Sequence, residues 1–344
     1  MKRNVEFLYL SQEDVIACGG LDMAKAIEDI EKTYSMAEQG QCLEPLLPSV
    51  AKYYNPWRGR HMATHMGCLG GDFDVVGALV VISNSENPIK RKAPTRTGIF
   101  VINDLETGFP LAIMDVNLIG SVRTGAIGGV AAKYLARADS EVVAVIGAGV
   151  INRCHIMAFN EVLKGIKQVK VFDTKSEKAQ VFAKEMGEEL GLSFEVTGSA
   201  QETIVGSDVI AAATPVSLLE GGYVEASWIK EGSFFSQLSA YDAKVEVIRN
   251  SDKFVLDTLT QLDCRDRGIG LFCAQGLLKE EDILDLGDIV NDKMPGREND
   301  REKIFFKSWG VTAQTLMTAY RVYTEAKRKG VGQVLELWHE PYWV

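Results

Sequence analysis

The stretch that decides the fold reads EVVAVIGAGVINRCHI and runs from Glu141 to Ile156. An apolar run leads into two glycines, Gly147 and Gly149, and then into a segment that can form a helix. Glycines spaced in this way between a strand and a helix let the backbone approach a phosphate group at the helix N-terminus. Asn152 replaces the third glycine of the usual G-x-G-x-x-G. The stretch therefore predicts either a nucleotide site or an ordinary tight turn.

The next predicted strand, QVKVFD, favours the nucleotide site because it ends in Asp173. In dinucleotide-binding folds a carboxylate at this place accepts hydrogen bonds from the ribose hydroxyls. Gly147 would make the turn, and Gly149 would let backbone amides reach the pyrophosphate. A carboxylate at Asp173 would repel a 2′-phosphate, so we expect NAD rather than NADP, with Lys175 arguing the other way. Asn152 either pushes helix and strand apart or reaches the ligand with its amide, and we expect the second.

The segments around this stretch indicate the fold class. From about residue 120, helices alternate with short apolar strands that continue as SFEVT, DVIAAAT, SFFSQLS and KFVLD. This alternation is typical of an α/β fold with a doubly wound parallel sheet of the Rossmann type. The first third is predicted to be α+β, with antiparallel strands at 75–83, 97–104 and 110–115 and a hairpin loop at Gly108. A last amphipathic helix after about residue 310 is expected to return to this first domain.

Composition restricts the partners. The 344 residues are 46% hydrophobic and carry a net charge of -10, which allows two domains and argues against nucleic acid or a membrane surface as partner. Six scattered cysteines without C-x-x-C indicate reduced thiols, and no signal peptide or long apolar run is present, so we expect a cytoplasmic protein with a small-molecule partner. His61 and His65 lack a third ligand nearby, so we expect no metal site.

Four further residues are candidates for the site. Arg123 stands among small residues in IGSVRTGAIGG, which leaves its guanidinium able to bind a carboxylate or a cofactor phosphate. Thr214, Asp242 and Lys244 follow predicted strands of the parallel sheet, and ligands bind at the carboxyl ends of such strands.

The whole chain, from about Phe7 to the last helix, resembles the ornithine cyclodeaminase/mu-crystallin family. The matching segments are NDLETGFPLAIMD, SVRTGAIGGVAAKYLAR, AVIGAGVINR, VFDTK, PGREND and FFKSWG. Within the family the chain is most similar to the tyramine oxidase branch, which shares an LYLSQEDV-like start and a tryptophan-rich end.

The resemblance implies a homodimer whose NAD-binding Rossmann domain, here 121–311, is inserted into a substrate-binding and dimerisation domain, here 1–120 and 312–344. Family members bind NAD(P) and interconvert amino acids with imines. Arg123 matches the arginine that holds the substrate carboxylate. The positions that match family contacts to cofactor or substrate are Thr95, Arg123, Gly147, Gly149, Val150, Ile151, Asn152, Asp173, Thr214, Lys244 and Ser308.

Three positions depart from the family pattern. The second carboxylate-binding arginine and the lysine near the substrate fall at Leu47 and Leu79, and the catalytic aspartate of the cyclodeaminases falls at Ala240. Asp242 stands two residues later and can reach the same space. Leucines at substrate positions make an apolar wall, which suits a less polar amine, imine or imino acid and not ornithine.

Two functions of different classes follow from these residues. The first is an NAD-dependent oxidoreductase that transfers hydride at a carbon bonded to nitrogen, with Asp242 or Lys244 as proton carrier and Arg123 binding substrate. The second is an NAD-binding partner subunit that has lost its chemistry. A true amino-acid cyclodeaminase is a further alternative within the family.

Overall fold

The computed structural model describes residues 4–43, 53–55, 60–84, 86–215 and 221–343. The chain divides into two compact units. The first is built from both chain ends and comprises Met1–Asp22, Met36–Arg123 and Val311–Val344. The second comprises Met23–Ser35 and Thr124–Gly310. No helix within the described part of the chain is both long and apolar enough to cross a membrane.

The first unit holds a mixed sheet with one long helix against it. Its elements are β1 (Val5–Leu10), α1 (Gln12–Ala17), β2 (Cys42–Leu43), β3 (Tyr53–Asn55), β4 (Arg60–Leu69), β5 (Val75–Ser83), α3 (Asn87–Lys90), β6 (Arg96–Asp104), β7 (Pro110–Asp115), α11 (Thr312–Lys329) and β16 (Gln333–Trp338). The strand order is β16-β1-β7-β6-β5-β4-β2, with β3 on β4. The predicted antiparallel pairing of β5, β6 and β7 is confirmed.

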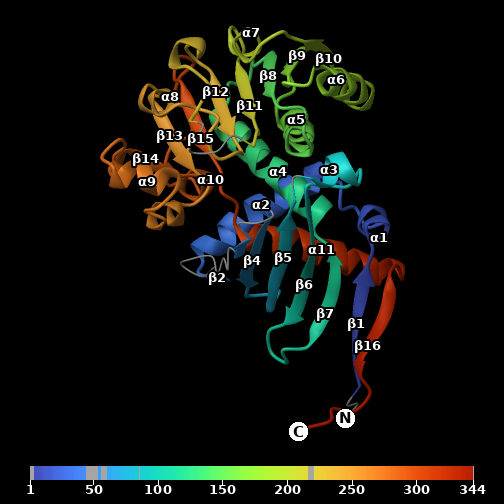
Figure 1. The fold of residues 1–344 in the computed structure, drawn as a ribbon. Helices are drawn as coiled ribbons and strands as arrows, with labels where there is room; N and C mark the ends of the chain where they lie inside the picture. Colours follow the sequence, from blue (N-terminus) through green and yellow to red (C-terminus); the bar gives the residue numbers. More distant parts are fainter. Residues whose placement is uncertain (1–3, 44–52, 56–59, 85, 216–220, 344) are drawn as a thin grey trace. The chain divides into compact units, whose positions relative to one another are not determined.

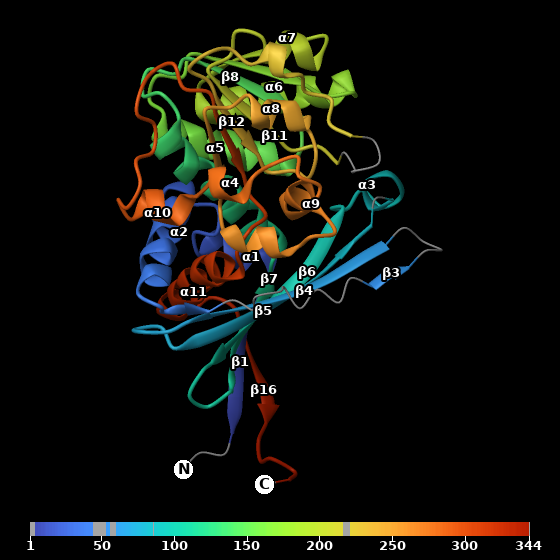
Figure 2. The same cartoon turned by 90° about the vertical axis from the view of Figure 1, so that its left-hand side faces the viewer.

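The two ends of the chain meet in this sheet. β1 pairs antiparallel with β16 and parallel with β7, and Figure 2 shows β1 and β16 running side by side. The sequence reading did not include either strand, so the sheet is mixed rather than purely antiparallel. The predicted hairpin between β6 and β7 is present, and Gly108 has the positive φ of 75° that its loop requires.

One face of the sheet packs against α11, which crosses β4, β5 and β6 (Figure 1). Strand alternation places Leu79 and Val81 on this face, where they join α11 residues such as Leu316 in one apolar core. Gly67 allows the close approach of helix and strand, because a Cβ there would lie 2.8 Å from the backbone nitrogen of Ala313. The helix predicted after residue 310 therefore does return to the first unit.

The second unit is built on a parallel sheet. Its elements are α2 (Met23–Glu38, as far as Ser35), α4 (Asn117–Leu135, from Thr124), β8 (Val142–Ile146), α5 (Val150–Val162), β9 (Gln168–Phe172), α6 (Ser176–Leu190), β10 (Ser193–Val196), α7 (Ala200–Ile204), β11 (Val209–Ala212), η1 (Ala226–Trp228), β12 (Phe234–Gln237), α8 (Val245–Arg249), β13 (Lys253–Leu256), η2 (Leu259–Asp263), α9 (Gly268–Ala274), η3 (Glu280–Asp282), β14 (Ile283–Asp285), α10 (Leu286–Val290) and β15 (Ile304–Lys307).

The strand order of this sheet is β10-β9-β8-β11-β12-β15-β13-β14, and every pairing between these strands is parallel. The order turns back on itself between β8 and β11, as it does in dinucleotide-binding folds. The predicted Rossmann-type α/β fold is confirmed. The sequence reading did not assign β15, which lies between β12 and β13 although it comes last in the chain.

One predicted boundary needs correction. The sequence reading placed all of 1–120 in the first domain, whereas Met23–Ser35 of α2 belongs to the second unit. Specific contacts explain this assignment: the Tyr34 hydroxyl donates to the Asp257 carbonyl at 2.9 Å, and Glu31 accepts a hydrogen bond from Lys133 at 2.7 Å. Half of one amphipathic helix therefore packs with residues far along the chain, which its own sequence does not reveal.

Glycines let α4 lie directly on α5. A Cβ at Gly125 would fall on the backbone carbonyl of Cys154, and one at Gly128 would overlap the His155 ring. Such contacts with backbone cannot be relieved by a change of rotamer. The GAIGG run in α4 thus fixes the position of α5, whose N-terminus follows the glycine pair.

We predict that Gly125→Ala destabilises the second unit by about 1–3 kcal/mol because of overpacking. Gly120→Ala in the same helix is the control, since a Cβ there has nothing within 4 Å and alanine favours a helix. Calorimetric unfolding should show a lower melting temperature for Gly125→Ala and an unchanged or higher one for Gly120→Ala. Equal melting temperatures for the two variants would contradict this account of the packing.

Candidate active site

The glycine pair forms an open helix N-terminus at the turning point of the parallel sheet. Gly147 has φ of 95°, and a Cβ there would lie 3.0 Å from Cγ2 of Thr214 after β11. Gly149 is the N-cap of α5, makes no side-chain cap and has nothing within 4 Å of an added Cβ. Backbone N–H groups at such an end suit a phosphate, so the loop fits the dinucleotide predicted from the sequence.

Asp173 closes the same loop from the end of β9. Its Oδ2 accepts from the Ala148 N–H at 3.0 Å, and its Oδ1 accepts from the Lys175 N–H at 2.9 Å. The carboxylate therefore lies at the glycine loop, as the sequence predicted. Each oxygen keeps further acceptor capacity for a hydroxyl group.

The expectation for the Asn152 side chain is wrong. This residue is 0% exposed, and its amide donates to the carbonyls of Ile146 and Gly147, both at 2.7 Å. The amide cannot reach a ligand because both of its bonds go to the backbone of the glycine loop. Asn152 instead ties the start of α5 to the end of β8.

His155 is a buried partner of Asn152 that the sequence reading missed. Its Nδ1 lies 3.3 Å from Oδ1 of Asn152, and its Nε2 lies 2.8 Å from the Ser236 hydroxyl in β12. Complete burial lowers the pKa of His155 to about 3, so the ring stays neutral and acts as a structural link between α5 and β12. A single histidine in a helix gives no sequence signal for this role.

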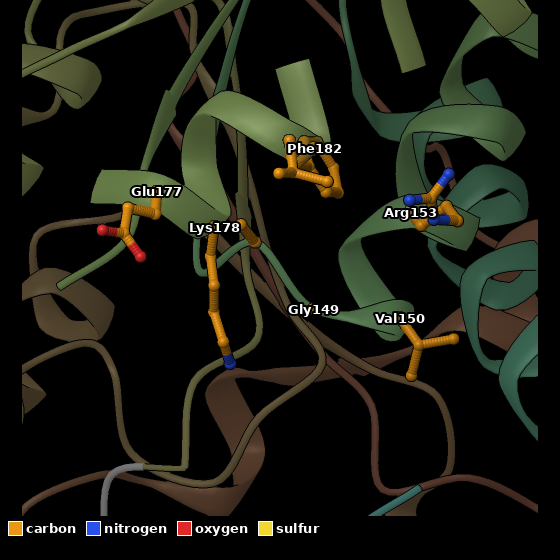
Figure 3. Close-up of a pocket in the computed structure, with 8 residues that line it drawn as sticks. Gly149, Val150, Arg153, Glu177, Lys178 and Phe182 are labelled. Carbon is orange, nitrogen blue, oxygen red and sulfur yellow. The ribbon is translucent and has the colours of Figure 1, made fainter. Parts of the chain in front are cut away.

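A groove with a volume of about 460 Å³ opens beside the loop, between the first turns of α5 and α6. Figure 3 shows Gly149 and Val150 on one side and Glu177 and Lys178 on the other. Arg153 lies over the Phe182 ring, 5.8 Å from its centroid, and pairs with Glu185 and Glu189 on α6. The groove therefore holds mixed charges and an apolar floor, next to the backbone amides.

Asp242 is the charged centre of the loop that follows β12. It is 0% exposed. Its Oδ1 accepts from the Thr214 hydroxyl and, at 3.1 Å, from the Tyr223 hydroxyl. Burial raises the pKa of Asp242 to about 6, while the hydrogen bonds from Thr214 and Tyr223 oppose the rise. Since Thr214 lies against Gly147, this carboxyl is linked to the nucleotide loop through one hydroxyl.

Lys307 and Asp257 form a second buried pair of charges that the sequence reading missed. Lys307 ends β15, is 5% exposed and donates to the Ser239 carbonyl at 2.5 Å. Asp257 accepts from the Ser308 hydroxyl at 2.6 Å and from the Trp309 and Gly310 N–H groups at 3.0 and 2.7 Å. The signal that could have found this pair is a lysine that directly follows the apolar residues IFF at a strand end.

Lys244 points elsewhere. It is the N-cap residue of α8, and its ammonium forms an ion pair with Glu225, both side chains being about two-fifths exposed at 41% and 44%. Ser308 is occupied by Asp257. The structure thus groups Thr214 and Asp242 with Gly147, while Lys244 and Ser308 engage other carboxylates.

The remaining predicted residues are spread over several elements. Val150 is exposed and Ile151 half-buried in the first turn of α5. Arg123 is half-buried in α4, and Thr95 is exposed before β6. Leu79 is 6% exposed in the core of the first unit. Leu47 lies outside the described residues.

Together the parallel sheet, the glycine loop and Asp173 define a dinucleotide-binding protein of the Rossmann type. The model of the ornithine cyclodeaminase/mu-crystallin family matches residues 10–330. The chain belongs to this family.

Relatives of known activity match along their whole length. The chain is 28% identical to N-((2S)-2-amino-2-carboxyethyl)-L-glutamate dehydrogenase of Staphylococcus aureus, over 97% of this chain and 100% of the relative. It is 31% identical to the structure of Thermococcus litoralis Delta(1)-pyrroline-2-carboxylate reductase in complex with NADH and L-proline, with a TM-score of 0.86 over 95% and 99% of the two chains. An archaeal alanine dehydrogenase dimer with bound NAD is 29% identical, with a TM-score of 0.85 over 97% and 100%.

Proposed function

We propose that the protein is an NAD-dependent oxidoreductase that acts at a carbon–nitrogen bond of an amine, imine, imino acid or amino acid. The observation that carries the proposal is the glycine loop closed by Asp173, in a chain that aligns end to end with a reductase bound to NADH and L-proline. NAD supplies the hydride chemistry when bound, and the protein supplies orientation and proton transfer.

Asp242 suits proton transfer better than Lys244 does. The Thr214 and Tyr223 hydroxyls both donate to Asp242, so their oxygen lone pairs remain able to accept a proton from a substrate nitrogen. A hydroxyl that accepts this proton passes its own proton to the carboxylate, and the reverse transfer returns it. Lys244 is held by Glu225, which leaves Asp242 as the acceptor.

The substrate is less polar than ornithine. Arg123 holds a carboxylate, but leucines stand at Leu47 and Leu79 where relatives use cations, and Ala240 replaces the acid of the cyclodeaminases. Each missing charge-assisted hydrogen bond costs about 1.5–3 kcal/mol, which weakens binding by roughly ten- to a hundredfold. An apolar wall instead favours a neutral or aromatic side of a substrate, which agrees with the resemblance to the tyramine oxidase branch.

We predict NAD(H)-linked turnover with at least one member of a panel of amines, ketimines and imino acids, and none of practical rate with ornithine. Arg123→Ala should lower kcat/KM by roughly ten- to a hundredfold, because a carboxylate loses a charge-assisted bond. Arg301→Ala is the control, since this side chain is 81% exposed. Absorbance at the NADH band measures turnover.

Three results would count against this prediction. Ornithine cyclodeamination at ordinary enzyme rates would show a true cyclodeaminase. An unchanged kcat/KM in Arg123→Ala would remove the carboxylate contact. NADH binding without turnover across the panel would favour the alternative, a partner subunit that keeps the cofactor but not the chemistry.

The charges around the glycine loop favour NAD over NADP. Asp173 lies where a 2′-phosphate would approach, and like charges repel strongly in partly dry surroundings. Glu177 adds a carboxylate to the neighbouring groove, and the Arg153 guanidinium is already neutralised by carboxylates of α6. Lys178 alone offers a cation to a phosphate among the residues that line this groove.

We therefore predict that the protein binds NADH more tightly than NADPH and that Asp173→Ser narrows the difference. Serine removes the negative charge but keeps a hydroxyl at the strand end. Titration calorimetry with both cofactors measures the two Kd values, and Asp72→Asn serves as a control far from the loop in sequence and exposed. A wild-type protein that prefers NADPH would show that the role assigned to this strand end is wrong.

A homodimer agrees with the outer face of the first unit's sheet. Strand alternation places Met66, Val80, Ile82 and Ile99 on the face opposite α11, and all four are exposed. Cross-strand pairs bring them together, because Val80 lies opposite Ile99 on β6 and Met66 lies on the neighbouring β4. A contiguous apolar sheet face is typical of an isologous interface.

We predict that light scattering at micromolar concentration gives twice the 37.8 kDa of one chain. Ile99→Lys should shift the mass toward a monomer, because it places a charge in the middle of this apolar face. Ile89→Lys, on an exposed residue of α3, is the matched control. A wild-type mass of one chain would exclude the dimer.

A further inference from the structure

Two buried groups of opposite charge face the ends of neighbouring strands in the second unit. β12 and β15 are adjacent and in register, with Gln237 opposite Lys307. The loop that leaves β12 carries Ser239 and Asp242. Asp242 is 0% exposed and Lys307 5% exposed, so neither charge is stabilised by bulk water.

We propose that Lys307 is a positioning residue that keeps Asp242 ionised and holds the loop 238–243 in place. This inference rests on the proposed function, in which Asp242 accepts the proton. Its substance is a division of labour: the hydroxyls of Thr214 and Tyr223 deliver the proton, and a buried ammonium sets how readily the carboxylate releases it.

Asp242 needs such a charge because its own hydrogen bonds are one-sided. Both hydroxyls donate to Oδ1, whereas Oδ2 is buried and has no hydrogen-bond partner among the described residues. A buried carboxylate with an unsatisfied oxygen favours the protonated form. Burial accordingly raises the pKa of Asp242 to about 6, and the attraction of Lys307 opposes this rise.

Lys307 is placed to act on Asp242 through both charge and geometry. Its ammonium donates to the Ser239 carbonyl, three residues before Asp242 in the same loop. Gln237 holds the other half of the loop: its amide donates to the Ala240 carbonyl at 3.2 Å and its oxygen accepts from the Ala243 N–H at 2.8 Å. The loop is thus fixed by two adjacent strand ends, one of which carries a positive charge.

Asp257 is the other charged group that faces Lys307. It accepts hydrogen bonds from Gln261, Ser308, Trp309 and Gly310, which stabilise its own negative charge. Burial lowers the pKa of Lys307 to about 8, and the attraction of Asp257 and then of Asp242 opposes this fall. Around neutral pH the cluster therefore holds one ammonium between two carboxylates.

The test is a carboxyl titration by NMR of the full-length protein with 13C-labelled aspartate side chains, in which Asp242→Asn identifies the Asp242 signal. Lys307→Gln keeps a donor for the Ser239 carbonyl but removes the charge. Lys307→Arg keeps both. We expect the Asp242 midpoint to rise by about one pH unit or more in the glutamine variant, as for loss of a nearby opposite charge, and to stay near the wild-type value in the arginine variant.

An unchanged midpoint in Lys307→Gln, with the fold retained, would overturn the proposal and leave Lys307 as a structural peg. If the glutamine variant does not fold, Lys307→Met takes its place with the same criterion. A midpoint raised equally in Lys307→Arg would also contradict a role for the charge. Asp72→Asn is the control variant, because it removes an exposed carboxyl and should leave the Asp242 signal in place.

This titration needs no substrate, so its failure is distinct from failure of the proposed function, which turnover with NADH decides. Where a substrate is found, the acid limb of the pH–kcat profile for amine oxidation should move to higher pH in Lys307→Gln. The ionised base is lost as pH falls through its pKa, and a higher pKa brings this loss to higher pH. KM for NADH should stay unchanged.

Discussion

The close approach of Gly147 to Thr214 is the constraint on which the site depends. At the turning point of the parallel sheet the loop after β8 passes so near the end of β11 that a Cβ on Gly147 would contact the Thr214 methyl at 3.0 Å. The same crowding fixes Asn152, whose amide ties the loop to the helix, and the GAIGG glycines of α4, which let the helix approach. A nucleotide loop and a proton relay can share one place because small residues leave no distance between them.

The interior of the second unit carries charge where most proteins carry hydrocarbon. Asp242, Lys307 and Asp257 are each at most 5% exposed, and buried charges persist only when they are paired and hydrogen-bonded. Asp257 meets that requirement through backbone N–H groups after β15, whereas Asp242 does so only on one oxygen. The imbalance costs stability and is the kind of strain that functional sites tolerate. It gives Asp242 a pKa that lets it exchange protons near neutral pH.

The sheet of the first unit has two apolar faces with different partners. α11 covers one face from within the chain, and its contact with β4 is close enough to require Gly67. The other face keeps exposed apolar residues on β4, β5 and β6, so it has the character of half an interface. The pairing of β1 with β16 brings both chain ends to one edge, which is what a unit assembled around an inserted domain requires.

The sequence by itself determined the features that depend on local pattern. Alternating strands and helices gave the parallel sheet, the glycine pair gave the loop and Asp173 gave its acidic partner, because each follows directly from a strand end. Tertiary structure decided what depends on distant partners. Asn152 turned inward since two carbonyls lie within reach, Lys244 was drawn to Glu225, and half of α2 joined the second unit. Lys307 became a candidate only when β15 was inserted beside β12, because pairing between strands far apart in the chain leaves no periodic trace in the residues that it brings together.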